Sequence, residues 1–363
     1  MAAEIRALTG VRGVAALVIV VYHFGKFHID RSSGHMVWAV PHGYMPVDMF
    51  FMLSGFVMGY TYKDAFVSAP WENYKTFLIK RFARLYPAYW VIGALYALKM
   101  AAGLTGEETF ARFDAWDAVG NFLMLVGWGL HIYPMIGVSW ASSAELGSYF
   151  ALPVVMKNVL QKGIVSWAAC VALSFAGIYL VSISGKGSSG PLDVVQVDSL
   201  LPLLRALAGF TLGLATFRFA GYLGRLSATA QDVLVVAILI AIVAAAVFTT
   251  GDLLVYALFI PFIAILSRDG RAAQFLFGNK LAYHLGVISY SIYLIHPLFI
   301  TFAERSSRHF GSTVTAYAIC VAVSCACIWL LSYLSYRFVE VLGRQFVISL
   351  FIPRGQTSRP ATV

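Results

Sequence analysis

The chain has 363 residues, of which 60% are hydrophobic and only 12% are charged, and its formal net charge is +9. Soluble domains carry about 25% charged residues, so this composition excludes an ordinary soluble protein. The positive charge is spread over short segments between apolar stretches, which indicates membrane topology and argues against nucleic-acid binding.

Ten apolar stretches follow one another along the chain, and several have the 18 or more mostly apolar residues that a membrane-spanning helix needs. They lie near residues 8–27, 44–62, 83–101, 139–156, 164–184, 200–219, 231–249, 253–267, 284–304 and 314–336. The pattern predicts an all-α polytopic membrane protein with about ten transmembrane helices. Segment 118–130 is also apolar but short and glycine-rich, so it is either an eleventh span or a half-penetrating or interfacial piece.

The distribution of basic residues selects between these topologies. With ten spans and a cytoplasmic N-terminus, more than two thirds of the 26 lysine and arginine residues fall on the inner side. Counting 118–130 as a span would invert every later loop and remove this bias. The positive-inside rule therefore favours ten spans with both termini cytoplasmic. We expect one transmembrane domain over residues 1–345 and a polar cytoplasmic tail over residues 346–363.

The first apolar stretch carries two ionisable residues, Arg12 and His23. Ionisable groups inside a membrane are costly and mark function by default. Because a helix rises 1.5 Å per residue, the two lie roughly 16 Å apart along the axis, and their spacing of about three turns places both on nearly the same face. One helix therefore offers a fixed cation near its start and a titratable imidazole near its far end.

Three more ionisable residues lie at a depth similar to that of His23, and they are Asp48, Glu145 and His296. A buried charge needs a partner or a watery cavity, so the economical hypothesis is that His23 meets Asp48 or Glu145. A carboxylate on one ring nitrogen would fix the tautomer and raise the basicity of the other. The structural alternatives are that Asp48 is a hydrogen-bond acceptor that caps or ties the second span and that Glu145 pairs with a loop arginine. His296 precedes Pro297 and would then satisfy backbone groups that the proline frees.

A second basic cluster, Lys80, Arg81 and Arg84, opens the third predicted span. Arg81 and Arg84 are three positions apart, so they share a face at a helix N-terminus, where backbone N–H groups favour anions. Arg12 approaches from the same side, and the three guanidiniums form a candidate phosphate clamp. The competing interpretation is ordinary positive-inside anchoring beside an aromatic belt. The belt residues are Tyr86, Tyr89 and Trp90.

Five sequence blocks, in this order, resemble those of the membrane acyltransferase family 3. They are LTGVRGVAALVIVVYHF, GYMPVDMFFMLSGFVMGY, FLIKRFARLYPAYW, SWASSAELGSYFALP and SYSIYLIHPLFI, which together span residues 8–300. The first block has the family's basic residue, ten intervening residues and histidine. The fourth departs from the pattern, because Ala141 replaces the serine after Trp140 and the aromatic pair Tyr149-Phe150 is reversed.

The resemblance implies an integral inner-membrane enzyme. Such an enzyme takes an acyl group, usually acetyl, from cytoplasmic acyl-coenzyme A and places it on a hydroxyl of a cell-surface or exported carbohydrate. It implies that His23 carries the proton or acyl transfer with Arg12 as its partner, and that Glu145 is the family's glutamate. Arg81 and Arg84 match the pair linked to donor binding. The expected partners are the lipid bilayer, acetyl-CoA and a carbohydrate acceptor, and no metal is expected because no ligand cluster is evident.

Coenzyme A is polyanionic, so its phosphates would stay at the clamp formed by Arg12, Arg81 and Arg84. Its pantetheine arm is roughly 15–20 Å long, which is about half the bilayer thickness. His23 would act as general base with Asp48 or Glu145 stabilising the imidazolium, or would carry the acyl group covalently. Acceptor selectivity is expected in the external loop 28–43, which contains Arg31, His35, Trp38 and His42. The alternative class is a proton-coupled transporter or exporter, although the sequence lacks the paired repeats typical of transporters. A third hypothesis is a sensor or scaffold that has lost catalytic activity.

Overall fold

The structure is a computed structural model that describes residues 4–27, 42–68, 70–103, 113–248, 251–311 and 313–352. Every regular element within these ranges is helical, which confirms the predicted all-α class for this part of the chain. The long helices are α1 (Arg6–Phe27), α2 (Pro46–Ser68), α3 (Pro70–Ala101), α6 (Ser139–Met156), α7 (Ile164–Ile183), α8 (Leu201–Ala220), α9 (Ala228–Phe248), α10 (Asp252–Leu266), α13 (Ser289–His309) and α14 (Val314–Ser335). The shorter elements are α5 (Ala115–Phe122), α11 (Arg271–Ala273), α12 (Lys280–Val287), α15 (Val341–Phe351), the π-helices η1 (Lys157–Gln161), η3 (Gln274–Gly278) and η4 (Tyr336–Glu340), and the 3-10 helix η2 (Gly221–Arg225).

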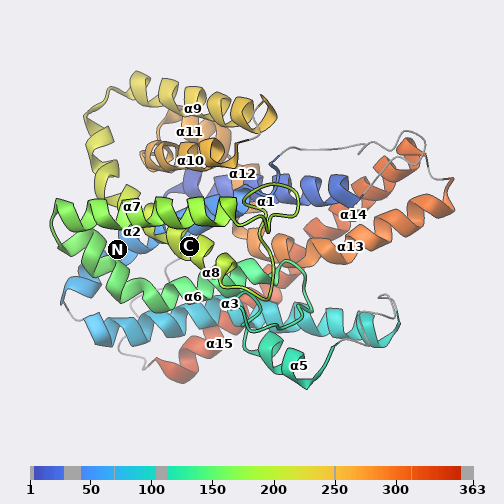
Figure 1. The fold of residues 1–363 in the computed structure, drawn as a ribbon. Helices are drawn as coiled ribbons and strands as arrows, with labels where there is room; N and C mark the ends of the chain where they lie inside the picture. The colour runs from blue at the N-terminus through green and yellow to red at the C-terminus, as the bar shows by residue number, and fades with distance from the viewer. Residues whose placement is uncertain are drawn as a thin grey trace.

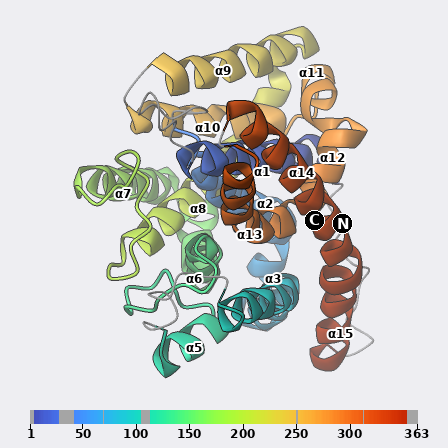
Figure 2. The same ribbon diagram turned by 90° about the vertical axis from the view of Figure 1, so that its right-hand side faces the viewer.

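Helices α1, α2 and α8 lie in the middle of the molecule, with α9 and α10 on one side and α3, α5 and α15 on the other (Figures 1 and 2). Helix α8 packs along α2, and glycine permits their close approach. A Cβ added at Gly55 would lie 1.8 Å from the carbonyl oxygen of Phe210, and one at Gly213 would lie 1.8 Å from that of Met52. The two backbones therefore touch at positions where no other residue fits.

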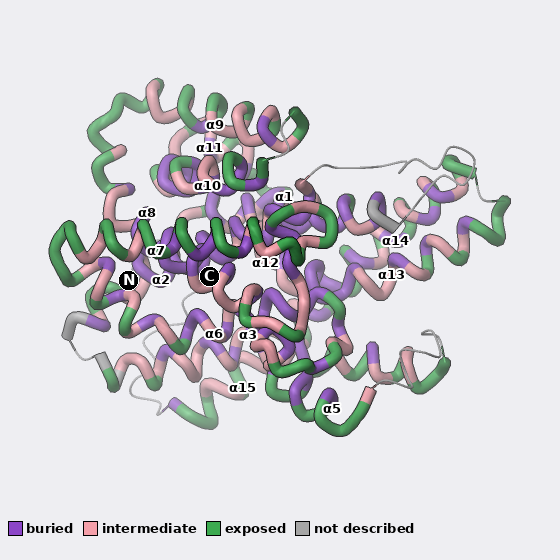
Figure 3. Tube along the Cα trace, in the orientation of Figure 1, coloured by how far each residue is buried: buried purple, intermediate pink, exposed green. Residues whose placement is uncertain are grey.

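Five helical segments of the described chain are long and apolar enough to cross a membrane, or up to seven if each of two bent pairs is one span. The five comprise α1, α7, α8 with η2, α9, and the continuous run α14–η4–α15. Figure 3 shows that α7 and α9 are largely exposed, which is the expected state of apolar helices that face lipid. The bent pairs are α10 with α11–η3, at 109°, and α12 with α13, at 73°.

The ten predicted spans all coincide with helices, but α2, α3 and α6 do not pass the same test of length and hydropathy. Helix α6 buries most of its polar side chains inside the protein, so its sequence is less constrained to be apolar than that of a lipid-facing helix. The ten-span topology with cytoplasmic termini therefore stays a prediction. The predicted domain boundary at residue 345 falls inside α15, because that helix continues to Phe351.

Segment 118–130 does not form a spanning helix. Helix α5 has 8 residues and ends at Phe122, which is too short to cross a bilayer. Turns follow, and two buried side chains of α5 hold them. Asp117 Oδ1 accepts a hydrogen bond from Tyr133 N at 2.6 Å, and Asn121 Oδ1 accepts one from Met135 N at 2.8 Å.

Hydrogen bonds between elements show which helix ends lie together. At the end that contains Arg12, Ala7 N donates to Asp269 Oδ1 across 3.2 Å and ties the start of α1 to the segment that follows α10. At the end that contains His23, Tyr22 OH donates to Asp193 Oδ2 across 3.3 Å and ties α1 to the segment between α7 and α8. We call these the Arg12 end and the His23 end. They correspond to the sides predicted to be cytoplasmic and external.

Candidate active site

A pocket opens at the Arg12 end, between α1, α3, α12 and the η4–α15 segment. Three arginines line it, namely Arg12, Arg84 and Arg344, together with Glu4 and Glu340. Arg12 and Arg84 thus converge as the sequence predicted. Arg344 was not predicted, because its sequence context does not distinguish it from the many arginines that anchor helix ends.

Arg81 does not line this pocket, which corrects its place in the predicted clamp. Its guanidinium lies over the rings of Tyr62, Phe77 and Tyr149 at 5.4, 5.4 and 5.8 Å, and its Nη2 donates to Tyr62 OH at 3.0 Å. Side chains three positions apart on an α-helix point in directions that differ by about 60° around the helix axis. That rotation directs Arg81 into the aromatic interface between α2 and α6 while Arg84 faces α1.

Glu145 belongs to the Arg12 end of the site. Its Oε1 accepts a hydrogen bond from Tyr149 OH at 2.7 Å, and the same hydroxyl lies 3.1 Å from Ser54 Oγ. Glu145 acts electrostatically on both Arg12 and Arg81. These contacts place the glutamate among the arginines, whereas the sequence hypothesis offered it as a partner for His23.

His23 forms a pair with His296, a fully buried residue of α13. His296 Nδ1 lies 3.2 Å from the carbonyl oxygen of Ile292 and must donate to it, so the Nε2 of a neutral His296 is an acceptor. His23 Nδ1 lies 2.9 Å from the carbonyl oxygen of Ile19 and 3.2 Å from His296 Nε2. Both neighbours accept, so the proton of His23 is on Nδ1 and Nε2 carries the basic lone pair.

Asp48 is committed to Arg205, so the hypothesis that it serves His23 is wrong for this arrangement. Arg205 Nε and Nη2 donate to the two carboxylate oxygens at 2.7 and 2.6 Å, and both residues are almost fully buried. The pair ties α2 to α8, which is the structural alternative. Arg205 was not among the residues that the sequence analysis singled out.

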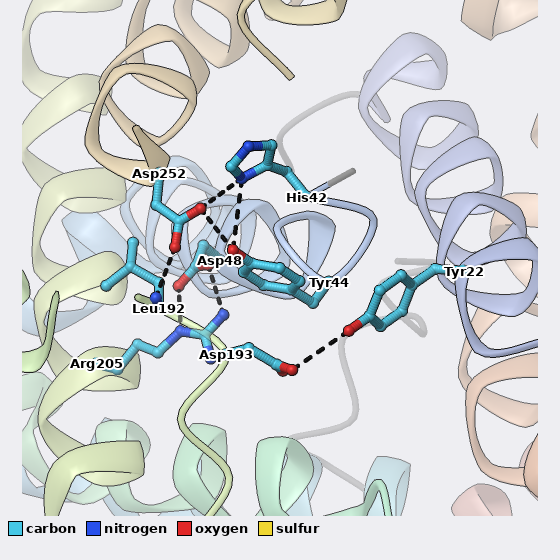
Figure 4. Close-up of polar contacts among 8 residues, drawn as sticks. All are labelled: Tyr22, His42, Tyr44, Asp48, Leu192, Asp193, Arg205 and Asp252. Carbon is cyan, nitrogen blue, oxygen red and sulfur yellow. Dashed lines mark hydrogen bonds and ion pairs between the residues drawn. The ribbon is translucent and has the colours of Figure 1, made fainter. Parts of the chain in front are cut away.

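Other acidic residues gather around this ion pair at the His23 end (Figure 4). Asp252 Oδ1 lies 2.5 Å from His42 Nδ1 and accepts from Tyr44 OH at 2.6 Å, while its Oδ2 accepts from Leu192 N at 2.6 Å. Of the four residues named in the predicted acceptor loop, His42 falls within the described ranges, whereas Arg31, His35 and Trp38 lie outside them.

Residues 5–333 match the family model described as an acyltransferase domain. The chain belongs to this family, acyltransferase family 3. The match confirms the resemblance of the five blocks, and it assigns the protein to the acyltransferases instead of the transporters. No group of three or more His, Cys, Asp or Glu residues in the described ranges could hold a metal ion.

Curated relatives of this acyltransferase carry related names. Acyltransferase MdmB of Streptomyces mycarofaciens is 24% identical over 82% of this chain and 80% of its own length. The putative O-acetyltransferase SACOL0978 of Staphylococcus aureus is 22% identical over 94% of this chain, but this chain spans only 57% of that relative. Protein 2 in the picA locus of Rhizobium radiobacter is 42% identical over 25% of this chain. No solved structure matches the acyltransferase.

Proposed function

We propose that this acyltransferase moves an acyl group, most simply acetyl, from cytoplasmic acyl-coenzyme A to a hydroxyl of a cell-surface or exported carbohydrate. The observation that carries the proposal is that helix α1 joins two chemically distinct sites. Arg12 lies in an arginine-lined pocket at one end, and His23 is oriented by His296 at the other. The name of the Staphylococcus aureus relative favours acetyl as the transferred group.

The Arg12 end suits a polyanionic donor. Arg12 and Arg84 provide guanidiniums that pair with phosphate oxygens bidentately. The separation of Arg12 and His23, roughly 16 Å along α1, is comparable to the reach of a pantetheine arm. A line of polar groups supports such a path, since Tyr290, Tyr293 and His296 follow one another at three-residue spacing on α13. In this arrangement the Arg12 end faces the cytoplasm of a cell inner membrane.

In the chemical step, the acceptor hydroxyl attacks the thioester carbonyl while His23 Nε2 takes its proton. The bond between the carbonyl carbon and sulfur breaks, and the thiolate of coenzyme A leaves and recovers the proton. His23 is positive between these events, and its Nδ1–H points at two acceptors, His296 Nε2 and the Ile19 carbonyl oxygen. General base catalysis of this kind contributes about 10²–10⁴-fold. A covalent route, in which Nε2 first attacks the thioester, requires the same tautomer.

The test compares surface glycans from cells that carry the wild-type protein, His23→Ala or the control His309→Ala. His309 is an exposed histidine at the end of α13, so its loss tests for unspecific effects. We expect an acyl mass on a glycan in the wild type and the control, and its absence in His23→Ala. Purified protein should also hydrolyse labelled acetyl-coenzyme A slowly. An acyl mass that persists in His23→Ala would exclude His23 from the reaction.

A further inference from the structure

One wall of the Arg12-end pocket comes from helix α15, which lies beyond the region that matches the family model. The match ends at residue 333, whereas Glu340 and Arg344 line the pocket. Helix α15 lies beside α3 (Figure 2), and a Cβ added at Gly343 would lie 2.5 Å from Pro87 Cβ. This close packing holds α15 against the helix that carries Arg84.

Two of the pocket's arginines, Arg12 and Arg344, lie at different depths. The Nε of Arg12 is sealed from solvent without a hydrogen-bond partner among the described residues, and Arg12 is on the helix that leads to His23. Arg344 is on α15, none of whose residues is buried, and it lies within electrostatic reach of Arg84. Arg12 therefore marks the inner part of the pocket and Arg344 its outer wall.

Acyl-coenzyme A carries its groups in a matching series. The thioester ends the pantetheine arm, the pyrophosphate joins that arm to the ribose, and the 3′-phosphate is on the ribose at the opposite end. A thioester directed along α1 toward His23 leaves the pyrophosphate near Arg12 and Arg84. We propose that Arg344 binds the ribose 3′-phosphate, so that α15 completes the donor site. This inference rests on the proposed acyl-coenzyme A donor.

The charges of the pocket support a phosphomonoester at this position. Three arginines and two glutamates line it, which leaves a net charge of +1 for an anionic ligand. Hydroxyl groups hold both glutamates, because Tyr283 OH donates to Glu4 at 3.1 Å and Ser291 Oγ donates to Glu340 at 2.5 Å. The planar fork of Arg344 can pair with two oxygens of a phosphate, whereas a ribose hydroxyl offers only one.

The experiment compares acetyl-coenzyme A with acetyl-3′-dephospho-coenzyme A as donors for the full-length protein in lipid nanodiscs. We expect the wild-type KM to be roughly 10- to 100-fold lower for acetyl-coenzyme A, as for loss of a charged hydrogen-bonded pair. Arg344→Gln should raise KM for acetyl-coenzyme A by that factor and leave both kcat and the KM for the dephospho donor unchanged. Arg344→Lys keeps the charge but not the planar fork, so its KM for acetyl-coenzyme A should lie between those of the wild type and Arg344→Gln.

Arg337→Gln is the matched control, because Arg337 is an exposed arginine of η4 that does not line the pocket and whose Nη1 lies 3.4 Å from Tyr333 OH. Arg337→Gln should keep the wild-type preference for acetyl-coenzyme A over the dephospho donor. The unchanged KM for the dephospho donor shows that Arg344→Gln is folded. Equal use of the two donors by the wild type, or a full preference retained by Arg344→Gln, overturns this inference alone. A wild-type protein that uses neither donor overturns it together with the proposed function.

Discussion

Replacing His296 with leucine tests how His23 is oriented. Leucine keeps the apolar packing of a fully buried position but removes the Nε2 acceptor that lies 3.2 Å from His23 Nδ1. A hydrogen bond to a charged group contributes about 1.5–3 kcal/mol, and the imidazolium of His23 is the charged form that it stabilises. The predicted loss is therefore roughly 10- to 100-fold in kcat. KM for acetyl-coenzyme A should stay constant, because His296 is at the end opposite to the donor pocket.

The assay is turnover of labelled acetyl-coenzyme A by purified protein, with thermal unfolding measured on the same samples. His296→Gln is the informative companion, because its amide oxygen can accept from Nδ1–H and should restore part of kcat. Ser307→Ala is the matched control, since it removes a buried hydroxyl of the same helix that donates to the Glu304 carbonyl oxygen. A kcat within twofold of wild type in His296→Leu, or a loss confined to KM, would refute this account of His23.

Substitutions at three further places, namely the buried ion pair, the arginines of α3 and the α2–α8 contact, test other parts of the structure. Asp48→Asn leaves Arg205 buried without its counter-ion and should cost about 3–5 kcal/mol of stability, whereas the double change Asp48→Leu with Arg205→Met should recover much of the thermal stability. Arg84→Gln should raise KM for acetyl-coenzyme A roughly tenfold. Arg81→Gln should raise that KM less than Arg84→Gln does and should lower the unfolding temperature, because Arg81 lies among aromatic rings. Gly213→Ala should cost at least about 1–3 kcal/mol of stability, since its methyl group would meet the Met52 carbonyl oxygen at 1.8 Å; an unchanged unfolding temperature contradicts this packing.

The positions of the helices follow closely from the sequence, because hydropathy is a property of each short stretch of chain. The directions of the helices do not follow in the same way. The predicted span 284–304 is divided into α12 and α13, which meet at 73°. Helix α12 packs on α1 so closely that a Cβ added at Gly286 would lie 1.9 Å from the carbonyl oxygen of Thr9. Such a contact joins residues far apart in sequence, so the hydropathy of a short stretch cannot predict it.

The residues of the donor pocket were likewise predicted only in part. Arg12 and Arg84 were predicted to converge, because topology places both at one end of the bundle. The third guanidinium was predicted to be Arg81, and the structure supplies Arg344 instead. Which arginine faces the pocket depends on the rotation of each helix about its axis, and one residue step changes that rotation by about 100°.

The sequence by itself determined that Arg12 and His23 share one helix and lie near its opposite ends, since both facts depend only on helical spacing. The tertiary structure decided the partner of His23. Sequence offered Asp48 and Glu145, because an unpaired carboxylate is the usual companion of a histidine. Asp48 is instead neutralised by Arg205, a partner 157 positions away along the chain. His296, from a helix at the other end of the sequence, lies beside His23, because only the packing of α13 on α1 brings the two rings together.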